Sequence, residues 1–172
     1  QPVVAWEKRP EIDRWILSLL NSLIKNVDNF LNSYEPTRAG RAISDFVNDH
    51  LSNWYVRLNR KRFWQGGLTE DKLSAYQTLY TCLETVAKLM APIAPFYADQ
   101  LFCDLISVTG REQVYSVHLS DFPVCQEALI DKNLEERMQM AQTISSMVLA
   151  LRRKVNIKVR QPLHILMVPV LD

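Results

Sequence analysis

Four cationic side chains lie within six residues of the chain, and no acidic residue lies among them. They are Arg57, Arg60, Lys61 and Arg62, near the end of the run Ala42–Trp64. At helical spacing, i, i+4, i+7 and i+8, one face of this run carries Asn53, Arg57, Arg60 and Lys61. Cations at such spacing could contact successive phosphate groups of a nucleic acid.

Two tryptophans accompany the cations. Trp54 falls beside the cationic face, and Trp64 precedes Gly66-Gly67, which is expected to end the helix. Cations for phosphates and aromatics that can stack on bases are what single-stranded nucleic acid needs from a protein. A solvated helix end is the alternative, since cations also suit the negative end of a helix dipole. The chemistry of this stretch leaves both interpretations open.

A second cluster of cations lies near the end of the chain. It consists of Arg152, Arg153, Lys154, Lys158 and Arg160. The chain has a net charge of only +1, from 20 Lys and Arg against 19 Asp and Glu, although nine of those cations lie in the two clusters. Like charges so close repel one another unless an anion arrives. This uneven distribution favours a nucleic-acid partner.

The elements that must position the first cluster are predicted to be helices. Apolar residues recur at steps of three and four from residue 11 to about residue 33, after Pro10, which suits a helix start. Pro36 then begins a second helix, expected to run back antiparallel to about Trp64. Its predicted apolar stripe is Ala42, Phe46, Val47, Leu51, Trp54, Tyr55 and Leu58. Trp54 is therefore a candidate for the core as well as for base stacking.

Three further helices are predicted. Thr69 is a good N-cap for the third, Pro95 opens the fourth before Gly110 ends it, and the last has an apolar seam that starts at Leu134. Residues 111–126 show no helical period and are predicted to be an ordered loop. Asp13 and Asp71 lie in the acidic first turns of the first and third predicted helices, where their carboxylates are expected to stabilise the helix by interacting with the positive end of its dipole.

The fold class predicted is all-α, an antiparallel bundle of about five helices with a short strand-like C-terminal tail. The seams of the first, second, third and last helices should bury against one another. We expect residues 1–9 to be a linker, 10–162 to be the helical domain, and 163–172 to be the truncated start of a further domain, since one strand cannot form a sheet alone. The start at Gln1 rather than Met suggests excision from a longer polypeptide.

Several classes of function are disfavoured by the composition. No apolar run approaches the roughly 20 residues that cross a bilayer, so no membrane partner is expected. Three widely spaced cysteines indicate neither a disulfide framework nor a zinc site, which favours a reducing, cytoplasmic setting. Glycine-rich phosphate loops and nucleophile motifs are absent, so no catalytic residue, metal or cofactor is expected in this chain.

The order of several motifs resembles one protein family. EIDRWILSLLNSLI, YEPTRAGRAISDFVNDHLSNWYVRLNRKRFW, LMAPIAPFYADQLF, SVHLSDFP and RRKVNIKVRQPL together resemble the region that follows the catalytic domain in isoleucyl-tRNA synthetases. The resemblance extends from Pro10 to about Leu163. Valyl-tRNA synthetases are the second choice within the same class, and a helical protein-interaction module with no RNA role is the alternative from another class.

This resemblance implies a helical anticodon-binding domain of a class I synthetase. The complete enzyme would use ATP and Mg to join isoleucine to its tRNA, but the H-x-G-H and K-M-S-K-S signatures are absent here. The implied partners are isoleucine tRNA and the catalytic and C-terminal domains of the same polypeptide. Trp54 aligns roughly with a base-contacting aromatic of related synthetases. The resemblance also makes the cations of both clusters candidate tRNA contacts, and the chemistry of the first stretch adds Trp64 and Asn53 to these candidates.

Overall fold

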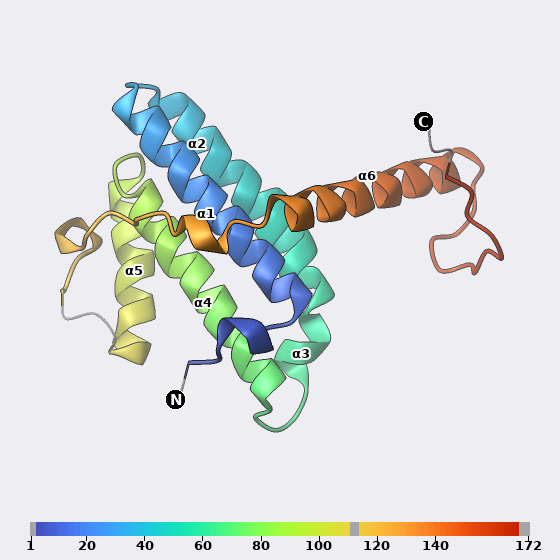
Figure 1. The fold of residues 1–172 in the computed structure, drawn as a ribbon, viewed down its shortest axis with the longest axis horizontal. Coiled ribbons are helices and arrows are strands. Elements are labelled where there is room, and N and C mark those ends of the chain that lie inside the picture. Colours follow the sequence, from blue (N-terminus) through green and yellow to red (C-terminus); the bar gives the residue numbers. More distant parts are fainter. Residues whose placement is uncertain (1–2, 111–113, 169–172) are drawn as a thin grey trace. The chain divides into compact units, whose positions relative to one another are not determined.

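The computed structural model describes residues 3–110 and 114–168, and these residues form helices and no strand. The all-α prediction is therefore confirmed. The α-helices are α1 (Glu11–Asn32), α2 (Pro36–Asp45), α3 (Arg60–Trp64), α4 (Glu70–Met90), α5 (Pro95–Thr109) and α6 (Lys132–Lys154), as Figure 1 shows. A π-helical segment, η2, spans Phe46–Val56, and three short 3-10 turns are η1 (Trp6–Lys8), η3 (Val117–Leu119) and η4 (Glu127–Leu129). The chain divides into two compact units, residues 1–132 and 133–172.

Helix α1 lies at the centre of the first unit, where it contacts α2, η2 and α4. Its bounds match the predicted helix at about 11–33. Apolar residues at steps of three and four turn one wide stripe of α1 inward. The buried apolar residues of that stripe are Trp15, Ile16, Leu17, Leu20, Leu23, Ile24 and Val27. Burying each large side chain contributes about 1.5–3 kcal/mol, so α1 organises the core.

The second predicted helix differs from the structure in its middle. It was expected to be one α-helix from Pro36 to about Trp64, but α2 passes into η2, and residues 57–59, with a turn at Asn59, separate η2 from α3. Hydrogen bonds in a π-helix close five residues apart, which widens each turn. Side chains after the π segment are therefore rotated relative to the predicted stripe. Leu58, predicted to be in the core, is 55% exposed, and the buried position falls on Asn59.

Helices α4 and α5 begin and end where the sequence predicts. The Thr69 hydroxyl accepts a hydrogen bond from the backbone N–H of Lys72 at 3.1 Å, which caps α4. Pro95 occupies the first turn of α5, and Gly110 ends it with a φ of 60°. That left-handed conformation suits glycine, which has no Cβ.

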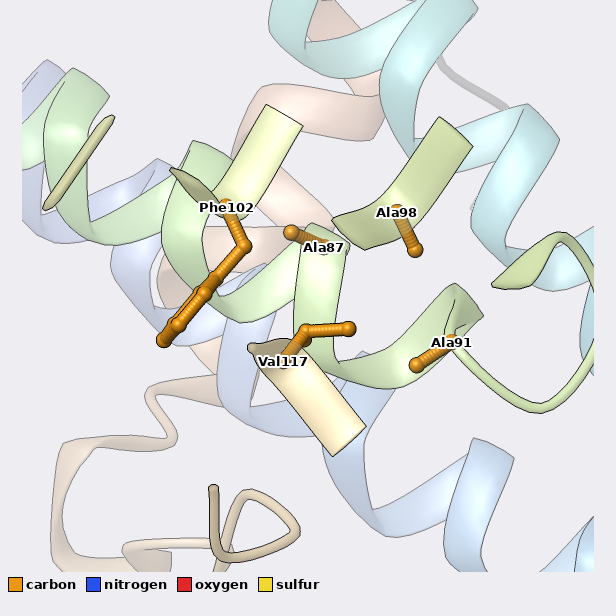
Figure 2. Packing of buried hydrophobic residues seen from close by; sticks show 5 residues of the cluster. All are labelled: Ala87, Ala91, Ala98, Phe102 and Val117. Carbon is orange, nitrogen blue, oxygen red and sulfur yellow. The ribbon is translucent and has the colours of Figure 1, made fainter. Parts of the chain in front are cut away.

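A small apolar cluster joins α4 and α5 to the loop that follows them. Figure 2 shows Ala87 and Ala91 of α4 facing Ala98 and Phe102 of α5, with Val117 of η3 against them. The loop over residues 114–126 is ordered around η3, as predicted, whereas residues 111–113 of the predicted loop lie outside the described residues. The loop therefore packs on the same bundle that holds the cationic helix end.

Asp99 of α5 fastens this loop. Its carboxylate accepts hydrogen bonds from the Ser116 hydroxyl at 2.7 Å and from the backbone N–H of Val117 at 2.9 Å. The Ser116 hydroxyl, followed by the Val117 N–H, lowers the pKa of Asp99. A lowered pKa means that the folded state prefers the ionised carboxylate.

Replacing Asp99 by asparagine should therefore change stability in a pH-dependent way. The wild-type advantage should be fully present above the unfolded pKa of about 4 and should disappear as the pH falls through the lower folded pKa. Urea midpoints of both proteins between pH 7 and pH 2.5 measure this. A difference that stays constant over that range would contradict the ionic role of Asp99.

The second unit contains nearly all of α6 and the residues that follow it. Within this unit the predicted apolar seam has little cover, since Leu151 and Val155 are each 61% exposed. Residues 163–168 form no strand, and the described residues offer no other strand with which they could pair. Residues 169–172 of the predicted tail lie outside the described residues. Burial of the α6 seam in the bundle, and the predicted domain bounds, stay predictions.

Candidate nucleic-acid interface

The short helix α3 has two chemically different faces. Successive residues are about 100° apart on a helix, so the first, second and fifth residues face away from the third and fourth. Arg60, Lys61 and Trp64 lie on the outer face, and Trp64 is 79% exposed. Arg62 and Phe63 lie on the inner face, with the Arg62 side chain only 15% exposed. The cationic run is therefore divided between solvent and the interior.

Arg62 was predicted to contact phosphate, but its guanidinium group is fully engaged inside the protein. Two of its N–H groups donate to the carboxylate of Asp13, at 2.7 and 3.0 Å. The others donate to the Asp71 carboxylate at 2.9 Å, the Asp71 carbonyl at 2.9 Å and the Asn59 side-chain oxygen at 2.8 Å. All five donors of the guanidinium are used. In this structure the Arg62 guanidinium therefore has no donor left for a phosphate.

Asp13 is the buried centre of this network. It is fully buried, and besides Arg62 it accepts hydrogen bonds from the Tyr55 hydroxyl at 2.8 Å and the Ser74 hydroxyl at 2.6 Å. Burial, followed by the charge of Asp13, raises the pKa of Tyr55, so its hydroxyl stays protonated and donates. Although burial lowers the pKa of Arg62, hydrogen bonds and charges from Asp13 and Asp71 outweigh it and raise that pKa. The network thus joins α1, η2, α3 and α4.

An aromatic contact supplies the second anchor of α3. The ring of Phe63 meets Tyr76 edge to face with centroids 5.3 Å apart, and meets Tyr55 at 6.5 Å. The Tyr76 hydroxyl donates to the Phe63 carbonyl at 3.2 Å, and Lys72 donates to the Gln65 carbonyl at 2.6 Å. The inner face of α3 and its C-terminal end are therefore fixed to α4.

The outer side of the same region carries the cations that remain available. Arg57, Arg60 and Lys61 are exposed, and no carboxylate among the described residues forms an ion pair with them. The guanidinium of Arg60 lies 6.0 Å from the centroid of the Trp64 ring, within the range of a cation–π contact. A free cation beside an exposed indole could hold a phosphate and an adjacent base together.

The remaining predicted residues of this stretch lie upstream in η2. Asn53 is exposed, and Trp54 is half-buried, whereas its neighbour Tyr55 is fully buried. The structure thus gives the central core position to Tyr55 and leaves part of the Trp54 ring accessible. Trp54 stays a candidate base contact.

The second cationic cluster belongs to the second unit. Arg152 was predicted to contact tRNA, but its guanidinium donates to the carbonyl oxygens of Lys158 at 2.9 Å and Gln161 at 2.8 Å. These bonds fold the chain back after α6, where Asn156 has a left-handed φ of 56°. Arg152 thus shapes a turn. The exposed cations of this cluster are Arg153, Lys154, Lys158 and Arg160.

Sequence reasoning missed the roles of Asp13 and Asp71. Both lie in first helical turns, where interaction with the helix dipole is a sufficient local explanation. A signal was present for Asp13, since it precedes Ile16 and Leu17 by three and four residues and is therefore in phase with the buried stripe. A carboxylate in that phase needs a buried partner.

Within 3–110 and 114–168, no group of three or more His, Cys, Asp or Glu side chains is placed to hold a metal ion. None of the helices described is both long and apolar enough to cross a membrane. Cys82, Cys103 and Cys125 are free thiols.

Free cations beside an exposed indole offer the phosphate and base contacts that binding of single-stranded nucleic acid uses. The family model described as "Anticodon-binding domain of tRNA ligase" matches residues 13–167, and the chain belongs to this family.

Several proteins similar in sequence to this chain are isoleucine–tRNA ligases, which is consistent with this family. The chain is 75% identical over 165 residues to an isoleucine–tRNA ligase of Bacteroides fragilis, which covers 96% of this chain. It is 73% and 67% identical, each over 169 residues and 98% of the chain, to the isoleucine–tRNA ligases of Bacteroides thetaiotaomicron and Porphyromonas gingivalis. The chain spans about 14% of the length of each of these relatives.

Proposed function

We propose that this chain is the anticodon-binding domain of an isoleucine–tRNA ligase and that it binds isoleucine tRNA at the anticodon loop. The observation that carries the proposal is the outer face of α3, where Arg60 and Lys61 are free and Trp64 is exposed. The family match and the identity to isoleucine–tRNA ligases support the choice of tRNA.

Binding would combine two kinds of contact. Arg57, Arg60 and Lys61 would neutralise phosphates of the loop, and Trp64 or the accessible part of Trp54 would stack on an unpaired base. Loop nucleotides suit this mode because their bases are not held in a duplex. Phosphate contacts fix the position of the RNA, and base contacts distinguish one loop from another.

The complete ligase would place the chemistry elsewhere. ATP and Mg would be used by a catalytic domain of the same polypeptide, and a C-terminal domain would extend the tRNA contact near Arg153, Lys154, Lys158 and Arg160. The present chain would hold the tRNA while that catalytic domain joins isoleucine to it. The proposal places the protein in the cytoplasm, the setting that free thiols also favour.

Binding of an isoleucine anticodon stem-loop, compared with an unrelated stem-loop, tests this function directly. Three neutralised phosphates predict that the logarithm of the association constant falls with the logarithm of the salt concentration at a slope of roughly −2 to −3. Equal binding of both stem-loops would contradict isoleucine specificity. No salt-dependent binding would contradict an RNA role and favour a protein-interaction module.

Replacing Arg60 and Lys61 together by alanine should reduce that slope by about one to two units. Stability should change by less than about 1 kcal/mol, because exposed cations contribute little to it. The control removes two cations elsewhere on the first unit, the exposed Arg41 and Lys25, which is ion-paired with Glu127, and should leave the slope near the wild-type value. An unchanged slope in the Arg60–Lys61 variant would show that these cations only solvate a helix end.

A further inference from the structure

Helix α3 cannot hold its own direction. It has five residues, and an isolated helix of that length is not stable in water because the cost of forming the first turn is not repaid. None of its residues is fully buried. The orientation of its outer face therefore depends on side chains that reach from the inner face to neighbouring helices.

Arg62 is the side chain that makes most of these connections. It bonds to Asp13 on α1 and to both the carboxylate and the carbonyl of Asp71 on α4. A planar fork with five donors is needed to reach these groups together, and lysine has only three donors around one nitrogen. The position of α3 is thus fixed by geometry as well as by charge.

The two carboxylates that hold Arg62 differ in their surroundings. Asp13 is fully buried and joined to the core, whereas the Asp71 side chain is 53% exposed. Replacing Asp71 by alanine therefore leaves the buried Asp13–Arg62 pair and the bond to the Asp71 carbonyl in place, and removes only the carboxylate that joins Arg62 to the start of α4. The two contributions can be tested separately.

We propose that Arg62 and Asp71 are positioning residues for RNA binding: by joining α3 to α4 they hold Arg60, Lys61 and Trp64 in a binding geometry before the RNA arrives. This inference rests on the proposed function. A surface ordered in advance avoids the cost of ordering its long side chains on binding. Neither residue needs to touch the RNA for this effect.

Replacing Asp71 by alanine tests the proposal by the sign of the change. Loss of a negative charge near a phosphate site should by itself tighten RNA binding. Loss of positioning should weaken it, by about three- to tenfold if one or two side chains must be ordered on binding. The matched control is Glu70→Ala, which removes the same charge from the same helical turn but breaks an ion pair with Lys8 instead of Arg62.

We expect Asp71→Ala to bind the isoleucine stem-loop more weakly and Glu70→Ala to bind it as tightly as wild type or more tightly. Arg62→Lys keeps the charge but not the fork, and it should also bind more weakly, with thermal unfolding confirming that each variant is folded at the assay temperature. If Asp71→Ala binds the stem-loop as tightly as Glu70→Ala, or Arg62→Lys binds it as tightly as wild type, the positioning role is wrong while the proposed function stands. If the wild-type chain does not bind the stem-loop, both the proposed function and the positioning role are wrong.

Discussion

Replacing Asp13 by alanine should lower the free energy of unfolding by about 3–5 kcal/mol, the usual cost of removing one partner of a buried ion pair. Asp13 is fully buried and accepts four hydrogen bonds. Its loss leaves the guanidinium of Arg62 and the hydroxyls of Tyr55 and Ser74 without their acceptor. Few of these donors can reach water instead, so most of them stay buried without an acceptor and the protein bears their desolvation cost. Urea unfolding followed by circular dichroism measures the change.

Asp28 provides the matched control for this prediction. It lies on the same helix, is exposed, and should change stability by less than about 0.5 kcal/mol when replaced by alanine. A loss below about 1 kcal/mol for Asp13→Ala would mean that water or another side chain replaces the carboxylate. The large value expected measures the cost of breaking the network and not the net contribution of the pair, because a well-packed apolar replacement of all partners can be nearly neutral.

Local signals explain why most of the helices could be predicted. Pro10, Pro36 and Pro95 each precede or open a helix, Thr69 caps one, and Gly110 ends one. Each of these residues acts on the backbone within a few positions of itself, so its effect can be inferred without knowing the fold.

The network around Arg62 could not be predicted from the same kind of signal. Arg62 and Asp13 are separated by 49 residues, and only the packing of α1 against η2, α3 and α4 brings them together. In the sequence, Arg62 is one of four clustered cations, and nothing there indicates that it is the one whose side chain turns inward. The cluster of four cations could be identified from composition. Which of the four face solvent and which faces the interior depends on the rotation of α3.

That rotation has its origin in the π-helical segment. Two adjacent aromatic residues, Trp54 and Tyr55, both fit an apolar stripe, and α-helical spacing cannot decide which one faces the core. The wider turn of η2 places Tyr55 in the core and also brings Asn59 inward. Asn59 then donates to the Tyr55 carbonyl at 2.8 Å and accepts from Arg62, so the π segment and the ion-pair network support each other.

Replacing Tyr55 by alanine should therefore cost about 3–5 kcal/mol of stability, the range for truncating a large buried aromatic residue. Trp54→Ala should cost less, roughly 1–2 kcal/mol, because only part of the indole leaves water on folding. This reverses the expectation of an uninterrupted α-helix, in which Trp54 would be a core residue. Urea unfolding of both variants, with Tyr55→Phe to separate the hydroxyl from the ring, gives the comparison.

Trp54→Ala and Tyr55→Phe also separate packing from RNA contact. If the accessible part of Trp54 stacks on a base, Trp54→Ala should lose roughly 1–3 kcal/mol of stem-loop binding while it remains folded. Tyr55→Phe keeps the buried ring and should bind the stem-loop nearly as tightly as wild type, although loss of its bond to Asp13 lowers stability by about 1 kcal/mol. A larger loss of stability for Trp54→Ala than for Tyr55→Ala would show that the indole is the core residue, and the register that the π segment imposes on η2 and α3 would then be wrong.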